Sequence, residues 1–175
     1  MTVLALIDLQ RIFAEPESGW ATPDFQRVIK PTQQLIDLIP TVVFTRFVAP
    51  AEPTGSWIPY YEQWPFALQP PDSYAYQLVD EFRGAPTLDK TTFGKWGPEL
   101  AEAVGPGGRL VLSGVTTDCC VLTTALAAVD AGVRVQVVAD ACAGVDEASH
   151  QKTLDIMRLY SPMLEVVTVE EVRNQ

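Results

Sequence analysis

Short apolar runs alternate with amphipathic helical patterns along most of the chain, and this alternation constrains the fold most strongly. Expected strands lie at Val3–Ile7, Thr41–Thr45, around Thr87–Leu88, Arg109–Ser113, Val133–Ala139 and Leu164–Val169. Helical patterns lie at Pro23–Leu38 (with Thr22 as N-cap), Pro98–Val104, Asp118–Ala131 and Asp146–Tyr160. Continuous apolar runs are typical of strands buried on both faces. The pattern therefore predicts a three-layer α/β/α fold, Rossmann-like, with a mostly parallel six-stranded sheet.

The length and composition predict a single domain covering residues 1–175. A chain of 175 residues with 47% apolar residues can bury one sizeable core. Residues 48–85 depart from the strand and helix pattern, because they hold six prolines and eight aromatic residues. An irregular insertion of this length could serve as a lid, a pocket wall or a subunit contact. It could equally be a Pro-rich excursion held in place by its own aromatic residues.

Charge and cysteine content exclude several classes of function. The net charge of −10 opposes binding to nucleic acid or to anionic lipid. No apolar run approaches the roughly 20 residues that span a bilayer, and Met1–Leu9 is typical of a buried strand rather than a signal peptide. Three cysteines, two of them adjacent, do not form a disulfide framework. We therefore expect a cytoplasmic protein with no nucleic-acid or membrane partner.

The segment Gly114–Val121, with sequence GVTTDCCV, places Cys120 on the first turn of a helix that follows a strand. The helix dipole and unpaired N–H groups at this position favour the thiolate, which is the nucleophilic form of cysteine. Cys119, about a hundred degrees further round a helix, is expected to point away and to be structural. The pattern therefore predicts Cys120 as a catalytic nucleophile.

Two further polar residues follow expected strands, as Cys120 does. Asp8 ends the first strand and Lys90 follows the strand around Thr87–Leu88. Ligands and catalytic groups collect at the carboxyl ends of parallel strands. A carboxylate beside a thiol can accept its proton, and an ammonium group can orient the carboxylate. We therefore expect Asp8, Lys90 and Cys120 to form a catalytic triad.

Four motifs resemble those of the isochorismatase-like cysteine hydrolases, a superfamily that includes nicotinamidase, N-carbamoylsarcosine amidohydrolase and isochorismatase. They are LIDLQRIF around Asp8, KTTF from Lys90, GVTTDCCV around Cys120, and VADAC ending at Cys142 with His150 after it. The Cys motif is the most specific, and the four together span nearly the whole chain in order.

The resemblance implies hydrolysis through a thioester on Cys120. It also implies an oxyanion hole made by the backbone N–H groups of Thr116 and Cys120, with a cis peptide between Val115 and Thr116. It further suggests that the chain assembles as a homodimer or a higher homo-oligomer and acts on a small molecule.

Candidate substrate-binding residues are Phe13, Trp57, Tyr60, Phe93 and Cys142, and Arg46 or Arg83 could pair with a substrate carboxylate. Nicotinamidases bind a metal through an aspartate and histidines downstream of the second strand. The matching segment here, TRFVAP, contains no histidine. We therefore expect no metal and no cofactor. The one histidine, His150, is expected to be structural.

These residues favour a metal-independent cysteine hydrolase that cleaves a C–N bond in a small amide or ureido compound. One alternative is isochorismatase-type hydrolysis of a vinyl ether, which does not need the thiol of Cys120. Another alternative is a catalytically idle oligomeric scaffold with the same fold. A nucleotide-dependent oxidoreductase is disfavoured because no glycine-rich loop follows the first strand.

Overall fold

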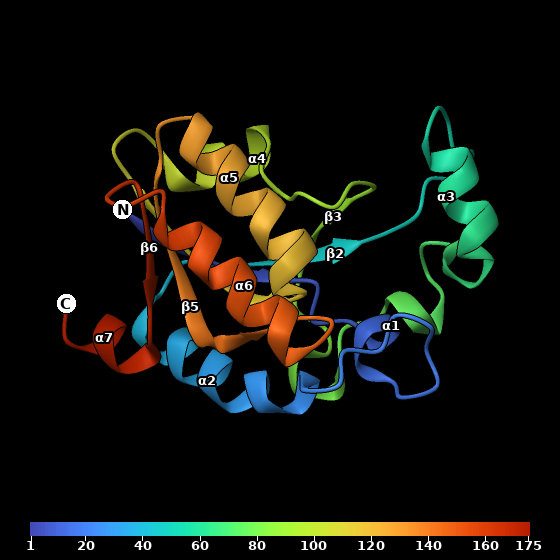
Figure 1. Cartoon of the computed structure of the whole chain (residues 1–175), viewed down its shortest axis with the longest axis horizontal. Coiled ribbons are helices and arrows are strands. Elements are labelled where there is room, and N and C mark those ends of the chain that lie inside the picture. Colours follow the sequence, from blue (N-terminus) through green and yellow to red (C-terminus); the bar gives the residue numbers. More distant parts are fainter.

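A computed structural model describes residues 1–175, and its centre is a six-stranded sheet in which all neighbouring strands are parallel (Figure 1). The strand order is β3-β2-β1-β4-β5-β6. The strands are β1 (Thr2–Ile7), β2 (Val42–Phe47), β3 (Thr87–Lys90), β4 (Arg109–Val115), β5 (Arg134–Ala143) and β6 (Leu164–Val167). Because β1 and β4 are central and strongly apolar, their side chains are buried on both faces.

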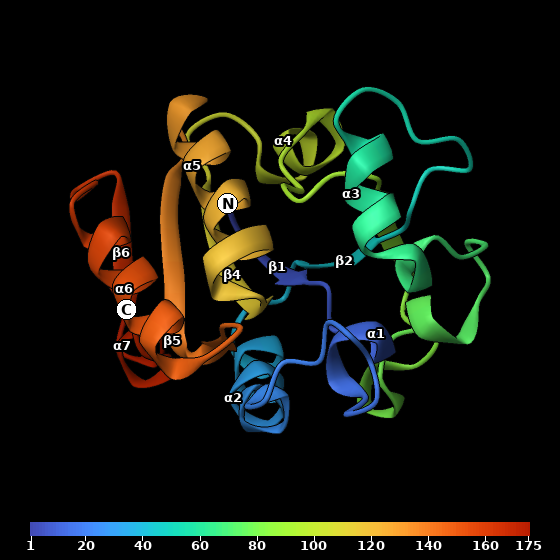
Figure 2. The same cartoon turned by 45° about the vertical axis from the view of Figure 1, so that its right-hand side comes forward.

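The helices are α1 (Arg11–Ala14), α2 (Phe25–Leu38), α3 (Trp57–Gln63), α4 (Pro98–Val104), α5 (Leu122–Asp130), α6 (Glu147–Arg158) and α7 (Val169–Arg173). Helices α2 and α7 cover one face of the sheet, and α4, α5 and α6 cover the other (Figures 1 and 2). Two apolar clusters fill the two spaces between sheet and helices. The predicted α/β/α fold is therefore confirmed. None of the helices combines the length and apolar character needed to cross a bilayer.

Element boundaries differ from the prediction at a few points. The predicted N-cap Thr22 lies outside α2, which begins at Phe25 after Asp24. The helix predicted from Asp118 starts as a π-helical turn, Thr117–Val121, and continues as α5. Hydrophobic periodicity detects the helical face, but it does not fix where the first turn begins or how tightly it is wound.

The insertion at residues 48–85 holds α3 and short 3₁₀ turns, and it lies beyond the carboxyl ends of β1 and β2 (Figures 1 and 2). The buried side chain of Gln10 fastens it there. Its amide nitrogen donates to the carbonyl oxygens of Phe47 and Tyr76, each at 2.9 Å, and its oxygen accepts from the Phe47 N–H at 2.8 Å. The insertion is thus tied to the edge of the sheet where the predicted site residues gather.

Candidate active site

Asp8 is placed by an unusually close approach of β1 and β4. Gly114 lies opposite Ile7 in the sheet, and a Cβ at Gly114 would lie 2.1 Å from the Ile7 carbonyl oxygen. The next residue, Asp8, turns the chain with a positive φ of 51°, a conformation that aspartate tolerates better than most residues. This geometry brings Asp8 beside the end of β4, where the Cys120 segment begins.

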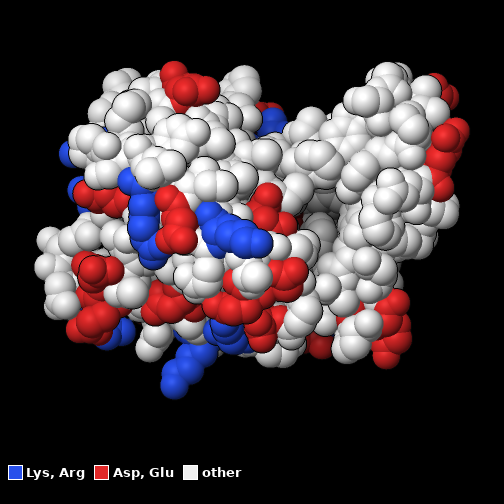
Figure 3. Space-filling model, in the orientation of Figure 1, with Lys and Arg blue, Asp and Glu red and all other residues white.

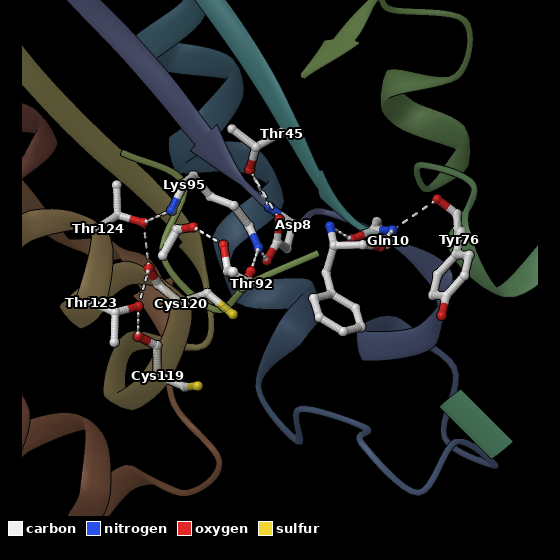
Figure 4. A network of polar contacts seen from close by, with 12 residues as sticks. Asp8, Gln10, Thr45, Tyr76, Thr92, Lys95, Cys119, Cys120, Thr123 and Thr124 are labelled. Carbon is white, nitrogen blue, oxygen red and sulfur yellow. Dashed lines mark hydrogen bonds and ion pairs between the residues drawn. The ribbon is translucent and has the colours of Figure 1, made fainter. Parts of the chain in front are cut away.

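The Asp8 carboxylate forms a fully buried ion pair with Lys95 (Figure 4). Asp8 Oδ2 lies 3.0 Å from Lys95 Nζ, and both side chains are 0% exposed. The Thr45 hydroxyl donates to Asp8 Oδ1 at 3.0 Å, and Lys95 Nζ also donates to the Thr92 carbonyl oxygen at 2.7 Å. Such further hydrogen bonds stabilise a charge pair removed from water, and Asp8 Oδ2 itself has only the Lys95 contact and no hydrogen-bond partner.

The prediction that Lys90 lies beside Asp8 is wrong. Lys90 is the last residue of β3, and its Nζ donates to Glu99 Oε2 at 2.7 Å in a partly exposed pair. The chain after β3 bends back, so that Lys95 rather than Lys90 reaches Asp8. The Lys95 N–H is fixed by the Thr124 hydroxyl at 2.8 Å. Lys95 is therefore a site residue that the sequence analysis missed.

Cys120 lies on the π-helical turn Thr117–Val121, as the motif predicts for a residue just after β4. Its carbonyl accepts a 2.6 Å hydrogen bond from the Thr124 hydroxyl, which also receives the Lys95 N–H. This chain of bonds joins the Cys120 turn to Lys95. In Figure 4 the Cys120 sulfur points to the side on which Asp8 and Lys95 lie. The structure thus brings Asp8 and Cys120 together, with Lys95 as the cation.

The expected stabilisation of the Cys120 thiolate is not found. The pKa of Cys120 lies well above its usual range because of its interaction with the Cys119 thiol, its burial and the nearby Asp8 carboxylate. Lys95 acts in the opposite direction. The favourable helix position is outweighed by the low-dielectric surroundings and the negative neighbours. Cys120 is therefore a thiol in this structure, and it needs a base before it can attack.

Cys119 also departs from the prediction. It is partly buried and lines the same cavity as Cys120, with the two sulfurs on the same side of the turn (Figure 4). Its interaction with Cys120 lowers the pKa of Cys119 below the usual value, against the effect of burial. The wider winding of a π-helical turn changes the angle between consecutive side chains, so a reading based on the α-helix misplaces Cys119.

The backbone around Thr116 has the predicted features. The peptide between Val115 and Thr116 is cis, and Thr116 and Cys120 both line the cavity. The Thr116 carbonyl accepts from the N–H groups of Cys119 and Val121, at 3.2 and 3.1 Å. The Thr116 N–H itself has no acceptor within the chain, so it is free to bind an oxygen atom.

A cavity of about 430 Å³ opens onto the two cysteines. Its other walls are mainly aromatic: Phe13, Trp20, Phe47, Tyr60, Trp64 and Phe93. Three of these, Phe13, Tyr60 and Phe93, are among the predicted substrate-binding residues. Tyr60 and Trp64 come from the insertion, which therefore forms one wall. Cavities of this size commonly bind small molecules.

Two predicted substrate-binding residues do not line the cavity. Trp57 lies behind the wall, with its ring 4.9 Å from that of Phe93 and 5.3 Å from that of Tyr60. Cys142 is fully buried in the sheet, where burial raises its pKa to about 12. The sequence analysis missed Trp20, and the clustering of aromatics after β1 was the only signal for it.

The polar residues outside this cluster have structural partners. Arg46 pairs with Asp89 at 2.5 Å, and Arg83 pairs with Asp80, so neither arginine reaches the cavity. His150 Nδ1 lies 2.8 Å from the Thr117 hydroxyl, and burial lowers its pKa. No group of three or more His, Cys, Asp or Glu side chains is placed to hold a metal ion. The residues present therefore do not fit a histidine-bound metal beside Asp8.

The family model described as "Isochorismatase domain" matches residues 2–171 of this chain. A curated protein, "Isochorismatase domain-containing protein 2" of Xenopus laevis, is 39% identical over 72 residues. That match covers 39% of this chain and 35% of the Xenopus protein, so the chain spans about a third of the length of this relative.

Several solved structures share the fold. A cysteine hydrolase from Pseudomonas syringae is 19% identical, with a TM-score of 0.83 over 99% of this chain and 91% of that one. N-carbamoylsarcosine amidase from Thermoplasma acidophilum is 21% identical, with a TM-score of 0.74 over 97% and 96%. A nicotinamidase from Acinetobacter is 20% identical, with a TM-score of 0.77 over 98% and 97%.

Proposed function

The chain belongs to the isochorismatase family, and from this premise we propose that it is a hydrolase that cleaves a C–N bond in a small amide or ureido compound. The observation that carries the proposal is the Cys120 thiol in the wall of a cavity, beside the buried Asp8–Lys95 pair. A nucleophile, a base and a cation that orients the base are the parts required for nucleophilic hydrolysis. Amidases among the structural relatives are consistent with this chemistry.

In the first step, Asp8 accepts the proton of Cys120 as the sulfur attacks the carbonyl carbon of the substrate. The raised pKa of Cys120 fits a proton that leaves only when the substrate is in place. Lys95 and the Thr45 hydroxyl hold the carboxylate in position through contacts of 3.0 Å each. Lys95 is thus proposed as a positioning residue in place of the predicted Lys90.

The attack makes a tetrahedral oxyanion, which we propose is bound by the backbone N–H groups of Thr116 and Cys120. Collapse of this intermediate breaks the C–N bond, and Asp8 returns its proton to the leaving amine. Water then attacks the Cys120 thioester with Asp8 as base, releasing the acid and restoring the thiol. The net reaction consumes one water and yields an acid and an amine. No step needs a metal, and the residues present do not fit one.

The two alternatives make different use of the site. Vinyl-ether hydrolysis does not use the thiol, so Cys120 would have no chemical role in it. An idle scaffold likewise leaves a buried ion pair beside a thiol unexplained, although burying such a pair opposes stability unless it is fully compensated.

Trapping the acyl-enzyme tests the proposal. The protein is mixed with the activated ester p-nitrophenyl acetate, quenched in acid, and analysed by intact mass and peptide mapping. We expect one acetyl group on Cys120 and a burst of p-nitrophenol. Both should be lost in Cys120→Ala and kept in Cys142→Ala, which removes a thiol buried in the sheet. Ammonia release from primary amides and ureas should follow the same pattern. An acetyl group that persists in Cys120→Ala, or turnover without acylation, would refute the thioester route.

A further inference from the structure

The cavity beside Cys120 has no Asp, Glu, Lys, Arg or His side chain among its 12 lining residues, and 10 of these residues are hydrophobic. We propose that its substrate carries an uncharged, largely aromatic acyl group, and that the site excludes substrates with a carboxylate or an ammonium group near the reacting carbon. This inference rests on the proposed function and narrows the amide or ureido class to its uncharged members.

The aromatic wall is held together by its own ring contacts. Trp20 lies at its centre, stacked on Phe13 at 6.0 Å and in edge contact with Phe47 at 5.7 Å and Trp64 at 6.3 Å. Tyr60 packs against Trp20 at 5.9 Å and against Phe93 at 5.5 Å. Rings held in this way offer preformed flat surfaces, so a planar acyl group binds with little loss of side-chain freedom.

The cations nearest the site cannot compensate for a carboxylate on the substrate. Lys95 is already paired with Asp8, and Arg46 with Asp89. Figure 3 shows a hollow between the body of the molecule and the insertion, and in this view the insertion carries few charged side chains next to it. A charge brought into such surroundings loses water without gaining a partner, which is costly.

The position of the charged group on the substrate also matters, because the reacting carbon must lie beside the two cysteines. In a small ureido acid such as N-carbamoylglycine, the carboxylate is only a few atoms from that carbon. It would be forced against the aromatic wall, whereas the alkyl chain of the uncharged analogue n-propylurea would match that wall. The pair benzamide and 4-carboxybenzamide makes the same comparison for a planar acyl group.

Binding to the Cys120→Ala variant tests the inference without depending on chemistry. The fluorescence of Trp20 and Trp64, which line the cavity, reports occupancy. We expect benzamide to bind at least about tenfold more tightly than 4-carboxybenzamide or 4-(aminomethyl)benzamide. The same order is expected for n-propylurea over N-carbamoylglycine. Equal or tighter binding of the charged members would overturn the inference, and so would the absence of any binding by the uncharged ones.

A cation introduced at an exposed residue of the cavity wall gives a second, independent test. Val145 lines the cavity and is 52% exposed, and only its backbone N–H is engaged, donating to Asp118 Oδ1 at 2.8 Å. In the Cys120→Ala background, Val145→Arg should improve binding of 4-carboxybenzamide at least about threefold relative to benzamide, since it supplies the missing cation. Val145→Gln, of similar length and no charge, should not. An equal effect of both variants would contradict the inference.

The two proposals fail in distinguishable ways. If wild-type protein shows no acetylation of Cys120 but Cys120→Ala still prefers uncharged ligands, the thioester chemistry is wrong and the binding preference stands. If Cys120 is acetylated but carboxylated compounds bind as well as uncharged ones, the chemistry stands and the substrate class is wrong.

Discussion

Two lysines five positions apart have opposite environments, and this difference decides which one supports the chemistry. Lys95 is fully buried against Asp8, whereas Lys90 holds Glu99, a residue whose side chain is 57% exposed. We expect Lys95→Met to lower the rate of Cys120 acetylation by at least about 100-fold, because Asp8 loses the cation that holds it in place. Lys90→Met should change this rate by no more than about fivefold, since exposed pairs contribute about 1 kcal/mol or less.

A structural role for Lys95 must be separated from this effect. Removing one partner of a buried pair costs about 3–5 kcal/mol, so the stability of Lys95→Met has to be measured by urea unfolding. The rate is compared at temperatures where both variants are folded. Lys95→Arg keeps the charge and should retain more activity than Lys95→Met. A large loss of activity in Lys90→Met with a folded protein would restore Lys90 as the functional lysine.

The Cys119 thiol is the largest cause of the raised pKa of Cys120. Removing it in Cys119→Ala should therefore lower the pKa of Cys120 toward its usual value. More thiolate is then present at pH 8, and alkylation of Cys120 by iodoacetamide should be at least about threefold faster. Peptide mapping across a pH series separates the cysteines. An unchanged or slower rate at Cys120 would show that Cys119 does not control its proton.

At the scale of single residues, the sequence predicted those parts of the site that follow directly from strand ends. Asp8 comes immediately after β1, and Cys120 lies in a specific motif after β4. Lys95 could not be placed, because its position depends on how seven irregular residues bend after β3. Cys119 was misplaced because a π-helical turn cannot be told from an α-helical turn by residue spacing. Trp20 lies in a loop, where no periodicity indicates which way a side chain points.

At the scale of elements, the contact between β1 and β4 sets the distance between Asp8, which follows β1, and the Cys120 turn, which follows β4. Gly114 has φ of +122°, and an added Cβ would meet the Ile7 carbonyl oxygen at 2.1 Å. Gly114→Ala should destabilise the fold by about 3 kcal/mol or more, because backbone must move to make room. Because Asp8 follows Ile7 directly, Cys120 acetylation should also fall in the folded fraction.

Gly132 provides the matched control for this substitution. It also has a positive φ, +82°, but a Cβ there would meet nothing within 4 Å. Gly132→Ala therefore carries only the backbone cost of about 1–2 kcal/mol and should leave acetylation of Cys120 unaffected. Unfolding in urea measures both variants. Equal losses of stability would mean that the close approach at Gly114 is unimportant.

The elements themselves were predictable wherever burial on both faces gives a continuous apolar run. The central strands β1 and β4 follow this rule, whereas the edge strand β3 (TLDK) is partly exposed and was placed only approximately. The helices between the strands show the expected spacing. The insertion was not predictable, because its shape depends on contacts between rings and on the Gln10 side chain, which bonds to Phe47 and Tyr76 far away in sequence. Such contacts leave no periodic pattern in the chain.

At the scale of the whole molecule, the insertion belongs to the same core as the sheet. Buried residues of the insertion, Tyr61, Ala67, Tyr76 and Phe82, join one apolar cluster with residues of β1, β2 and α2. Trp20 and Trp57 pack on this cluster, and Trp96 packs on the cluster across the sheet. A wall that shares its core with the sheet should not open independently of it.

We therefore expect a single cooperative unfolding transition. Tryptophan fluorescence reports mainly the region around the cavity, while far-ultraviolet circular dichroism reports the sheet and helices. The two curves in urea should coincide, because neither the insertion nor the sheet keeps a complete core without the other. Gln10→Leu, which removes the hydrogen bond from Gln10 to Tyr76 in the insertion and two hydrogen bonds to Phe47 at the end of β2, should shift both curves to lower urea concentration together. A fluorescence transition that precedes the loss of secondary structure would show instead that the insertion is a separately unfolding unit. The aromatic wall would then be formed by the substrate rather than in advance of it.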